Sequence, residues 1–206
     1  MRAIIALIVL IATGCASSPP VASADAPPAP GVAGDDAANA TTSQDAAPSV
    51  PRFVRTNLGD LGVSAYLPRG FPSFEASKSE DGSEMRVGEL VDGGFVFSCI
   101  AVRFKDPMEG TGDQLEELLI SYLNHLQTVF EVVDSTGYGR GYTLESDPAA
   151  RGVLDYWQDS EERDIAVMGW ITPTHIIVLT IGGKGEYPHF NAQQMYLRGA
   201  RFTPAP

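Results

Sequence analysis

The sequence predicts an α+β fold, a layered α/β/α sandwich around a mostly antiparallel sheet of about six or seven strands. Three observations lead to this prediction: short turns join many strand-like segments, several segments are apolar on both sides, and one long segment has helical periodicity. All nine Phe, both Trp and all seven Tyr lie within residues 52–206. We therefore expect a single globular domain there, since a segment of that length can bury a core of its own.

The first strands are expected early in this domain. Residues Leu61–Leu67 alternate between apolar and polar side chains and stop before Pro68, which lacks the amide that a central strand needs. The segments Glu84–Val91 and Phe95–Phe104 flank Asp92-Gly93-Gly94, a sequence typical of a hairpin turn. The second of these segments is apolar on both sides, so we expect both of its faces to be covered.

One long helix is predicted from Asp113 to Phe130. Its apolar residues recur at spacings of three, four, seven and eight, and they are Leu115, Leu118, Leu119, Tyr122, Leu123, Leu126, Val129 and Phe130. Such a stripe buries one face of a helix against another layer of the fold. Asp113 followed by Glu116 resembles a capping box, so we expect the helix to begin there.

Four further strands and a short helix are predicted in the C-terminal half. The strands are Tyr138–Glu145, Gly152–Gln158, Arg163–Ile171 and His175–Ile181, and Thr172-Pro173-Thr174 joins the last two as a hairpin. These two strands are apolar on both sides and should lie in the middle of the sheet. A short helix is expected at Phe190–Leu197, and Ala200–Phe202 is expected to close the fold.

The N-terminus carries the pattern of a secretory signal. Arg2 is followed by ten apolar residues, Ala3–Ala12, a run too short to span a membrane as a helix. The next residues complete Ala12-Thr13-Gly14-Cys15, which resembles the lipobox of bacterial lipoproteins. The resemblance implies that residues 1–14 are a signal peptide and that Cys15 is the lipidated first residue of the mature chain, acylated with chains such as palmitate. It departs from the commonest lipobox in having Ala12 where Leu is usual.

An alternative for this region is ordinary signal cleavage after Ala22-Ser23-Ala24, which would discard Cys15. With a lipid anchor, the residue after the cysteine favours one location. It is Ala16 and not the Asp that favours retention in the inner membrane of enteric bacteria, so we expect the outer membrane, facing the periplasm. More than one acyl chain gives stable anchoring.

Residues 15–51 are predicted to be a disordered tether that begins at the lipidated Cys15. Residues 16–51 contain eleven Ala, seven Pro and four Asp, with no Lys, Arg or aromatic residue. Such a segment buries too little apolar surface to offset the entropy of ordering its backbone, and its prolines interrupt helices.

Charge and cysteine content exclude several classes of protein. The chain has 26 Asp and Glu against 14 Lys and Arg, a net charge of -12. Nucleic acid is therefore not expected as a partner, because phosphate binding needs clustered cations. Two cysteines are too few for a disulfide-stapled scaffold or a cysteine-rich zinc module.

The order of motifs in the domain resembles the PsbP-like family. An Ala-Tyr-Leu-Pro-Arg-Gly-Phe-Pro segment (65–72) precedes a hairpin and the long helix, and a Gly-Tyr-Gly-Arg-Gly-Tyr segment (137–142) precedes three strands and a terminal helix ending in Gly-Ala-Arg-Phe (199–202). The family includes the extrinsic PsbP subunit of photosystem II, the Ran-binding protein Mog and small bacterial lipoproteins. The resemblance covers about residues 53–203 and implies a binding or assembly module, not an enzyme.

Candidates for chemistry are few, and we expect no metal, no cofactor and no catalytic residue. His125, His175 and His189 lack partners at metal-ligand spacing and are expected on the surface or in turns. Cys99 lies in the most apolar strand and is expected to be a buried hydrophobic residue. The acidic run Asp159–Asp164 joins two strands and is expected to be a solvated hairpin tip.

The glycine-rich segment Gly137–Gly141 precedes a strand and not a helix, so a turn or bulge is expected instead of a nucleotide site. Tyr138, Arg140 and Tyr142 are residue types common at interfaces, and they form the candidate partner surface.

Two functions follow from these observations. In the first, the chain is a membrane-tethered envelope lipoprotein acting as a non-catalytic protein-binding or assembly module, with an envelope protein as its partner. In the second, it is a small-ligand or cell-wall-associated protein, or a hydrolase, with a pocket on one sheet face. The second gains support if a pocket holds Arg140, Arg151 or Asp155.

Overall fold

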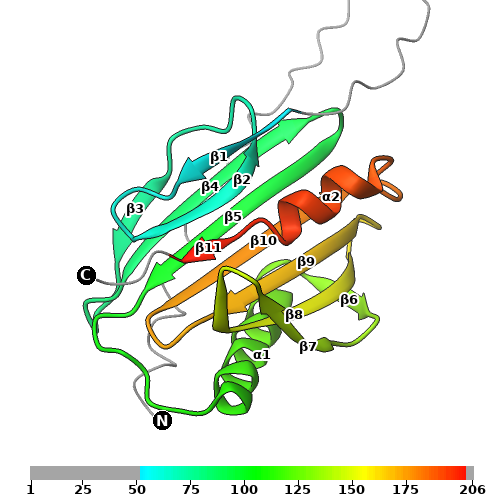
Figure 1. Ribbon diagram of the computed structural model, residues 1–206. Coiled ribbons are helices and arrows are strands. Elements are labelled where there is room, and N and C mark those ends of the chain that lie inside the picture. The colour runs from blue at the N-terminus through cyan, green and yellow to red at the C-terminus, as the bar shows by residue number, and fades with distance from the viewer. Residues whose placement is uncertain (1–51, 203–206) are drawn as a thin grey trace, which may run out of the picture.

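The computed structural model of the chain describes residues 52–202, which form two antiparallel sheets and two helices (Figure 1). The predicted signal peptide, Cys15 and the tether lie outside the described residues. Within residues 52–202, no helix is both long and apolar enough to cross a membrane.

The larger sheet has eight strands. Its order is β3 (Glu75–Lys78), β4 (Glu84–Asp92), β5 (Phe95–Arg103), β10 (His175–Gly183), β9 (Asp164–Ile171), β8 (Asp147–Asp159) and β6 (Val132–Ser135), with β7 (Gly139–Leu144) also paired to β8. Every pairing is antiparallel. The predicted class and strand direction are therefore confirmed. The predicted count of six or seven strands is wrong, because β3 and β6 are short, largely polar strands without a clear apolar period.

A second, three-stranded sheet was not predicted. It consists of β1 (Phe53–Asn57), β2 (Val63–Pro68) and β11 (Arg201–Phe202), with β2 in the middle. The predicted strand Leu61–Leu67 therefore exists as β2, but it belongs to this smaller sheet. Its alternating pattern is the same in either sheet, so the sequence pattern could not show which sheet it joins.

Helix α1 (Gly112–Val129) covers one face of the larger sheet (Figure 1). It packs on β8 and β9, and it approaches β9 closely at Gly169, where an added Cβ would lie 2.8 Å from Leu119 Cδ1. The predicted capping box at Asp113 and Glu116 is wrong. The N-cap is Thr111, whose hydroxyl accepts from the Gln114 amide while the Gln114 side chain accepts from the Thr111 amide.

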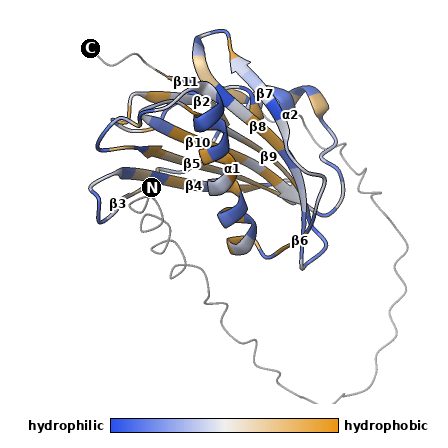
Figure 2. Ribbon diagram, turned by 90° about the horizontal axis from the view of Figure 1, so that it is seen from below, coloured by the Kyte–Doolittle hydropathy of each residue, from blue (hydrophilic) through white to orange (hydrophobic). Residues whose placement is uncertain are grey.

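The opposite face of the larger sheet is covered by the smaller sheet together with helix α2 (Phe190–Leu197). The core on this side is one cluster drawn from both sheets and α2, and its largest members are Trp170, Tyr196 and Phe97. Figure 2 shows apolar residues concentrated on the central strands β5, β9 and β10. The predicted α/β/α layering is thus corrected, because a sheet and a short helix together form the second outer layer.

Candidate functional site

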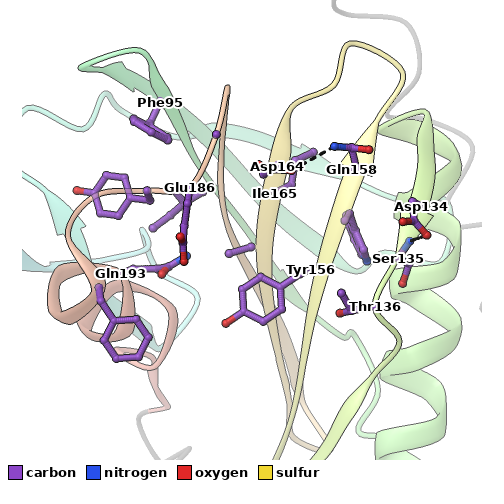
Figure 3. A pocket seen from close by; sticks show the side chains of 16 residues that line it. Phe95, Asp134, Ser135, Thr136, Tyr156, Gln158, Asp164, Ile165, Glu186 and Gln193 are labelled. Atoms are coloured by element: carbon purple, nitrogen blue, oxygen red, sulfur yellow. Dashed lines mark hydrogen bonds between the residues drawn. The ribbon is translucent and has the colours of Figure 1, made fainter.

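A cavity of about 460 Å³ opens at one end of the larger sheet, beside the N-terminus of α2 (Figure 3). Its floor is built from cross-strand neighbours, which share one face of a sheet. Tyr156 lies opposite Ala166, and Ala166 lies opposite Ile181. The next row outward pairs Gln158 with Asp164. The floor therefore belongs to the sheet face that also carries α2.

Two walls enclose this floor. One wall is formed by α2 and the loop before it, with Glu186, Tyr187, Phe190 and Gln193. The loop is fixed by aromatic packing, because the ring of Tyr187 meets Phe95 edge-on with 5.0 Å between ring centroids. The other wall is formed by Asp134, Ser135 and Thr136, at and just after the end of β6. Figure 3 shows Tyr156 projecting between the two walls.

The cavity is acidic. Asp134, Asp164 and Glu186 line it, and in the described part of the chain no Lys or Arg does. Among residues 52–202, none of these three carboxylates takes part in an ion pair. Asp164 accepts only a long hydrogen bond of 3.4 Å from the side chain of Gln158. The three negative charges are therefore available to a positively charged ligand.

Gln193 adds a polar group that the fold leaves unused. Its residue surface is only 8% exposed, and within the described chain its side-chain amide makes no hydrogen bond. In Figure 3 the side chain extends from α2 toward Glu186 and the cavity. The amide atoms of Gln193 are not among the fully buried side-chain atoms that lack a partner in residues 52–202, so they are accessible from the cavity and can hydrogen-bond to a ligand.

No protein-family model matches this chain, and no curated protein matches it in sequence. What the cavity can bind therefore follows from its own side chains. Carboxylates attract a cation by charge, and the faces of aromatic rings attract it through their quadrupoles. Three carboxylates lie close to the rings of Tyr156 and Phe190, which are both exposed to solvent. This combination is suited to an ammonium or guanidinium group.

The predicted partner surface is divided in the folded chain. Tyr138 donates a hydrogen bond to Asn124 Oδ1 at 2.7 Å, and Arg140 pairs with Glu116 and Glu117, so both lie against α1. Tyr142 lies instead beneath Arg198, on the side of α2. The division follows from the register shifts in β7, which confirm the predicted bulge in the glycine-rich segment. None of the three residues lines the acidic cavity.

Beside the cavity, Asp155 is almost completely buried and forms the centre of a hydrogen-bond network. Its donors are Trp157 Nε1 (2.6 Å), Ser135 Oγ (2.8 Å), the Tyr156 amide (2.8 Å), Thr136 Oγ1 (3.2 Å) and Gln127 Nε2 (3.4 Å). These bonds join β6, β8 and α1 and position the wall that Ser135 and Thr136 form. Asp155, Arg140 and Arg151 do not line the cavity.

The other predicted candidates are structural. Cys99 is fully buried, and burial raises the pKa of its thiol far above the usual range. His175 was expected on the surface or in a turn but is buried, because its ring bridges the Leu61 carbonyl and the Thr174 hydroxyl. His125 and His189 are half-buried. Within the described residues, no three His, Cys, Asp or Glu side chains are grouped as a metal site.

The hairpin tip at Asp159–Asp164 is stabilised by hydrogen bonds to the side chain of its first residue, Asp159. Asp159 is buried and accepts hydrogen bonds from the amides of Glu161 and Arg163 and from Arg163 Nε at 2.6 Å. Burial alone would raise the pKa of Asp159, but the amide and guanidinium of Arg163 and the amide of Glu161 outweigh it and hold the pKa below its ordinary value. Only Asp164, at the far end of this run, reaches the cavity.

Sequence reasoning missed the cavity because its residues are scattered along the chain. Glu186 and Gln193 lie in and after a loop of mixed composition, while Asp164 belongs to a run that looks like an ordinary solvated turn. The only local signal is the acidity of that run. The cavity exists because antiparallel pairing brings the ends of β8, β9 and β10 to one edge of the fold.

Proposed function

We propose that this chain is a lipid-anchored lipoprotein of the bacterial cell envelope whose folded domain is a non-catalytic protein-binding or assembly module. Cys15 carries the anchor, and residues 15–51 form the tether. The outer membrane, on its periplasmic side, is the proposed location. The resemblance of residues 53–203 to the PsbP-like family supports the fold assignment and the role as a binding module, because members with known roles bind or assemble other proteins.

The acidic cavity is the observation that carries the binding role. Its carboxylates have no cationic partner among residues 52–202, and its aromatic rings remain exposed. A Lys or Arg side chain of a protein partner would supply the missing charge and would stack on Tyr156 or Phe190. Gln193 would provide a hydrogen bond at the bottom of the site. The proposed partner is therefore an envelope protein with an exposed cationic segment.

Site-specific photo-crosslinking in cells tests this proposal. A photoreactive residue would replace Phe190, which is 64% exposed at the rim of the cavity, in the tagged full-length protein. A matched probe would replace Val54, which is 45% exposed on β1 and away from the cavity. We expect a discrete crosslinked product at position 190 and none at 54. The product should be reduced at least fivefold by Asp164→Asn with Glu186→Gln.

Two results would contradict the proposal. Crosslinking of equal strength at positions 190 and 54 would mean that the cavity rim has no particular partner. A product at position 190 that persists unchanged without the two carboxylates would mean that charge does not recruit it. The same crosslinking from position 190 is repeated in the Cys15→Ser chain. Loss of the crosslinked product there would show that the partner binds only when the protein is anchored to the membrane.

A small ligand is the second candidate, and the size of the cavity favours it. About 460 Å³ falls within the range of roughly 300–1,000 Å³ that is common for small-molecule sites. The same side chains would select an organic cation, such as a free amine or a quaternary ammonium compound. Thermal unfolding of the full-length protein with choline, lysine or spermidine distinguishes this case, because only a true ligand raises the melting temperature in a saturable way.

A further inference from the structure

A second groove lies at the other end of α2 and has the opposite charge. It has a volume of about 400 Å³ and is bordered by β1, β2, β11, the turn after β7 and the C-terminal end of α2. Three arginines reach it from three separate elements: Arg55 on β1, Arg198 at the end of α2, and Arg201 on β11. We refer to this surface as the arginine groove.

Two of these guanidinium groups are held in place by aromatic rings. The guanidinium carbon of Arg55 lies 3.8 Å from the centroid of the Tyr66 ring, and that of Arg198 lies 5.0 Å from the centroid of Tyr142. Arg55 also donates a hydrogen bond to the Gly199 carbonyl. Stacking of this kind leaves the edge of the guanidinium group free to donate in its own plane. Two of the three arginines are therefore held in position before any ligand arrives.

The positive charge of the groove is not neutralised by the rest of the described chain. Five other basic residues pair with carboxylates, namely Lys78, Arg86, Arg103, Arg140 and Arg163. Arg55, Arg198 and Arg201 make no ion pair within residues 52–202. Of the residues that the structure describes, Glu145 is the one carboxylate that lines the groove. Three positive charges less one negative charge leave a formal charge of +2, in a protein whose net charge is -12.

We propose that the arginine groove binds a phosphate monoester carried on an organic group. A phosphate monoester bears a charge of about −1.5 to −2 at neutral pH, which matches the formal charge of the groove better than a single carboxylate does. The planar edge of guanidinium fits two phosphate oxygens at once. The groove is larger than a phosphate ion, and the accessible side chains of Tyr66 and Met195 give it the apolar surface on which a sugar ring or similar group packs.

This proposal is independent of the acidic cavity, because the two sites share no lining residue. The same phosphate chemistry could come from a soluble sugar phosphate or from the head group of a membrane lipid. The groove would bind the phosphate group that both sources carry. Separate arms of one experiment distinguish them.

The soluble arm is isothermal titration of the full-length protein with glucose 1-phosphate, with inorganic phosphate and with methyl glucoside as the neutral analogue. We expect saturable binding of glucose 1-phosphate, weaker binding of inorganic phosphate and none of methyl glucoside. Combined Arg198→Gln and Arg201→Gln substitutions should weaken binding at least tenfold. Arg69→Gln removes the same charge from an exposed residue outside the groove and should leave binding unchanged.

The lipid arm is flotation with vesicles of phosphatidylcholine, with or without phosphatidic acid. It uses the full-length Cys15→Ser chain, so that acyl chains on the protein cannot carry it to the vesicles. Flotation that depends on phosphatidic acid and on Arg198 and Arg201, without binding of glucose 1-phosphate, would assign the site to a lipid head group. Binding of both would assign it to the phosphate monoester in general.

The proposal is overturned if neither arm shows binding, or if the Arg198→Gln/Arg201→Gln chain binds as tightly as the wild-type chain. In either case Arg198 serves only to pack on Tyr142 and to offset the helix dipole of α2. Circular dichroism and urea unfolding of each variant show that lost binding does not reflect lost folding. Binding should also weaken as salt concentration rises, because the attraction is between exposed charges.

Discussion

Glu116 on α1 accepts a hydrogen bond from Arg140 Nε at 2.7 Å, and its other carboxylate oxygen accepts from the Gly141 amide at 2.9 Å. This carboxylate fastens the bulged strand β7 to the long helix. Gly141 has a φ of +80°, a conformation that glycine adopts without strain and that turns its amide toward Glu116. Glu116, which was predicted to complete a capping box with Asp113, therefore holds a neighbouring strand in place.

Replacing Glu116 with Ala should destabilise the protein by about 1–3 kcal/mol, because the Gly141 amide loses its acceptor in a partly buried position. Urea unfolding followed by tryptophan fluorescence measures the change. Glu117→Ala is the matched control, since Glu117 also pairs with Arg140 but is largely exposed to solvent, and it should have little effect. Equal effects of the two substitutions would contradict the role assigned to Glu116.

Replacing Gly169 with Ala should destabilise the fold by roughly 1–3 kcal/mol through overpacking, because the new methyl group would lie 2.8 Å from Leu119 Cδ1. The Leu119→Ala substitution alone should also destabilise the protein, because it leaves a cavity between α1 and β9. In the double variant the added methyl group occupies part of that cavity. The double variant should therefore lose less stability than the sum of the single changes, and strict additivity would show that the two residues do not interact.

Stability should fall as the pH drops from about 7.5 to 5.5, and His175 should account for part of the fall. Burial lowers the pKa of His175 and the charge of Arg103 lowers it further, although its hydrogen bond to the Leu61 carbonyl acts the other way. The folded state therefore favours the neutral ring. Its contribution is fully present above the unfolded pKa of about 6.5 and is lost as the pH falls through the lower folded value.

The measurement is the urea midpoint across this pH range for the wild-type chain and for His175→Asn. The variant should show a smaller dependence on pH. The pKa of Asp159 is also lowered, although burial alone would raise it. Its contribution to stability is lost only below about pH 4, so it does not affect the slope between pH 5.5 and 7.5. An identical slope in both chains between pH 5.5 and 7.5 would refute the assignment to His175.

Gln193→Leu should separate stability from binding. The side-chain amide of Gln193 lines the cavity and is not a fully buried group without a partner, so its loss should change the free energy of unfolding little. Crosslinking from position 190 should fall, because the ligand loses its hydrogen bond at the bottom of the cavity. Gln194→Leu, on the neighbouring position of α2 and outside the acidic cavity, is the control and should leave crosslinking intact.

The lipid anchor has a direct test. In bacterial cells that express the protein, the wild-type chain should fractionate with membranes and incorporate labelled palmitate if the proposed anchor is present, whereas Cys15→Ser should do neither. Ser18→Ala, placed three residues further along the proposed tether, should behave as the wild type. Labelling that survives in the Cys15→Ser chain would place the acylated residue elsewhere.

Much of the fold could be predicted because the strongest local patterns lie at the centre of the structure. The predicted strands Arg163–Ile171 and His175–Ile181 differ from β9 and β10 by two residues at most, and the predicted helix Phe190–Leu197 coincides with α2. These elements are long or strongly apolar, so local pattern and burial agree. Short polar strands such as β3 have no such pattern and depend on a neighbour for their shape.

The candidate sites could not be predicted to the same extent. The acidic cavity and the arginine groove both gather residues from distant parts of the chain, such as Asp164 with Glu186 and Arg55 with Arg198. Their spacing in the sequence carries no period and no motif. Tyr138, Arg140 and Tyr142 were predicted to form one surface because they are close together in the sequence. The register shifts in β7 separate their side chains.

The pairing of β11 with β2 has a consequence for how the protein is made. Phe202 lies opposite Val63, so the smaller sheet remains incomplete until the last described strand has left the ribosome. Until then the apolar face of β2 lacks its final cover. The core on this side is therefore closed by a pairing between residues 63 and 202, which lie far apart in the sequence, and such non-local pairings slow folding.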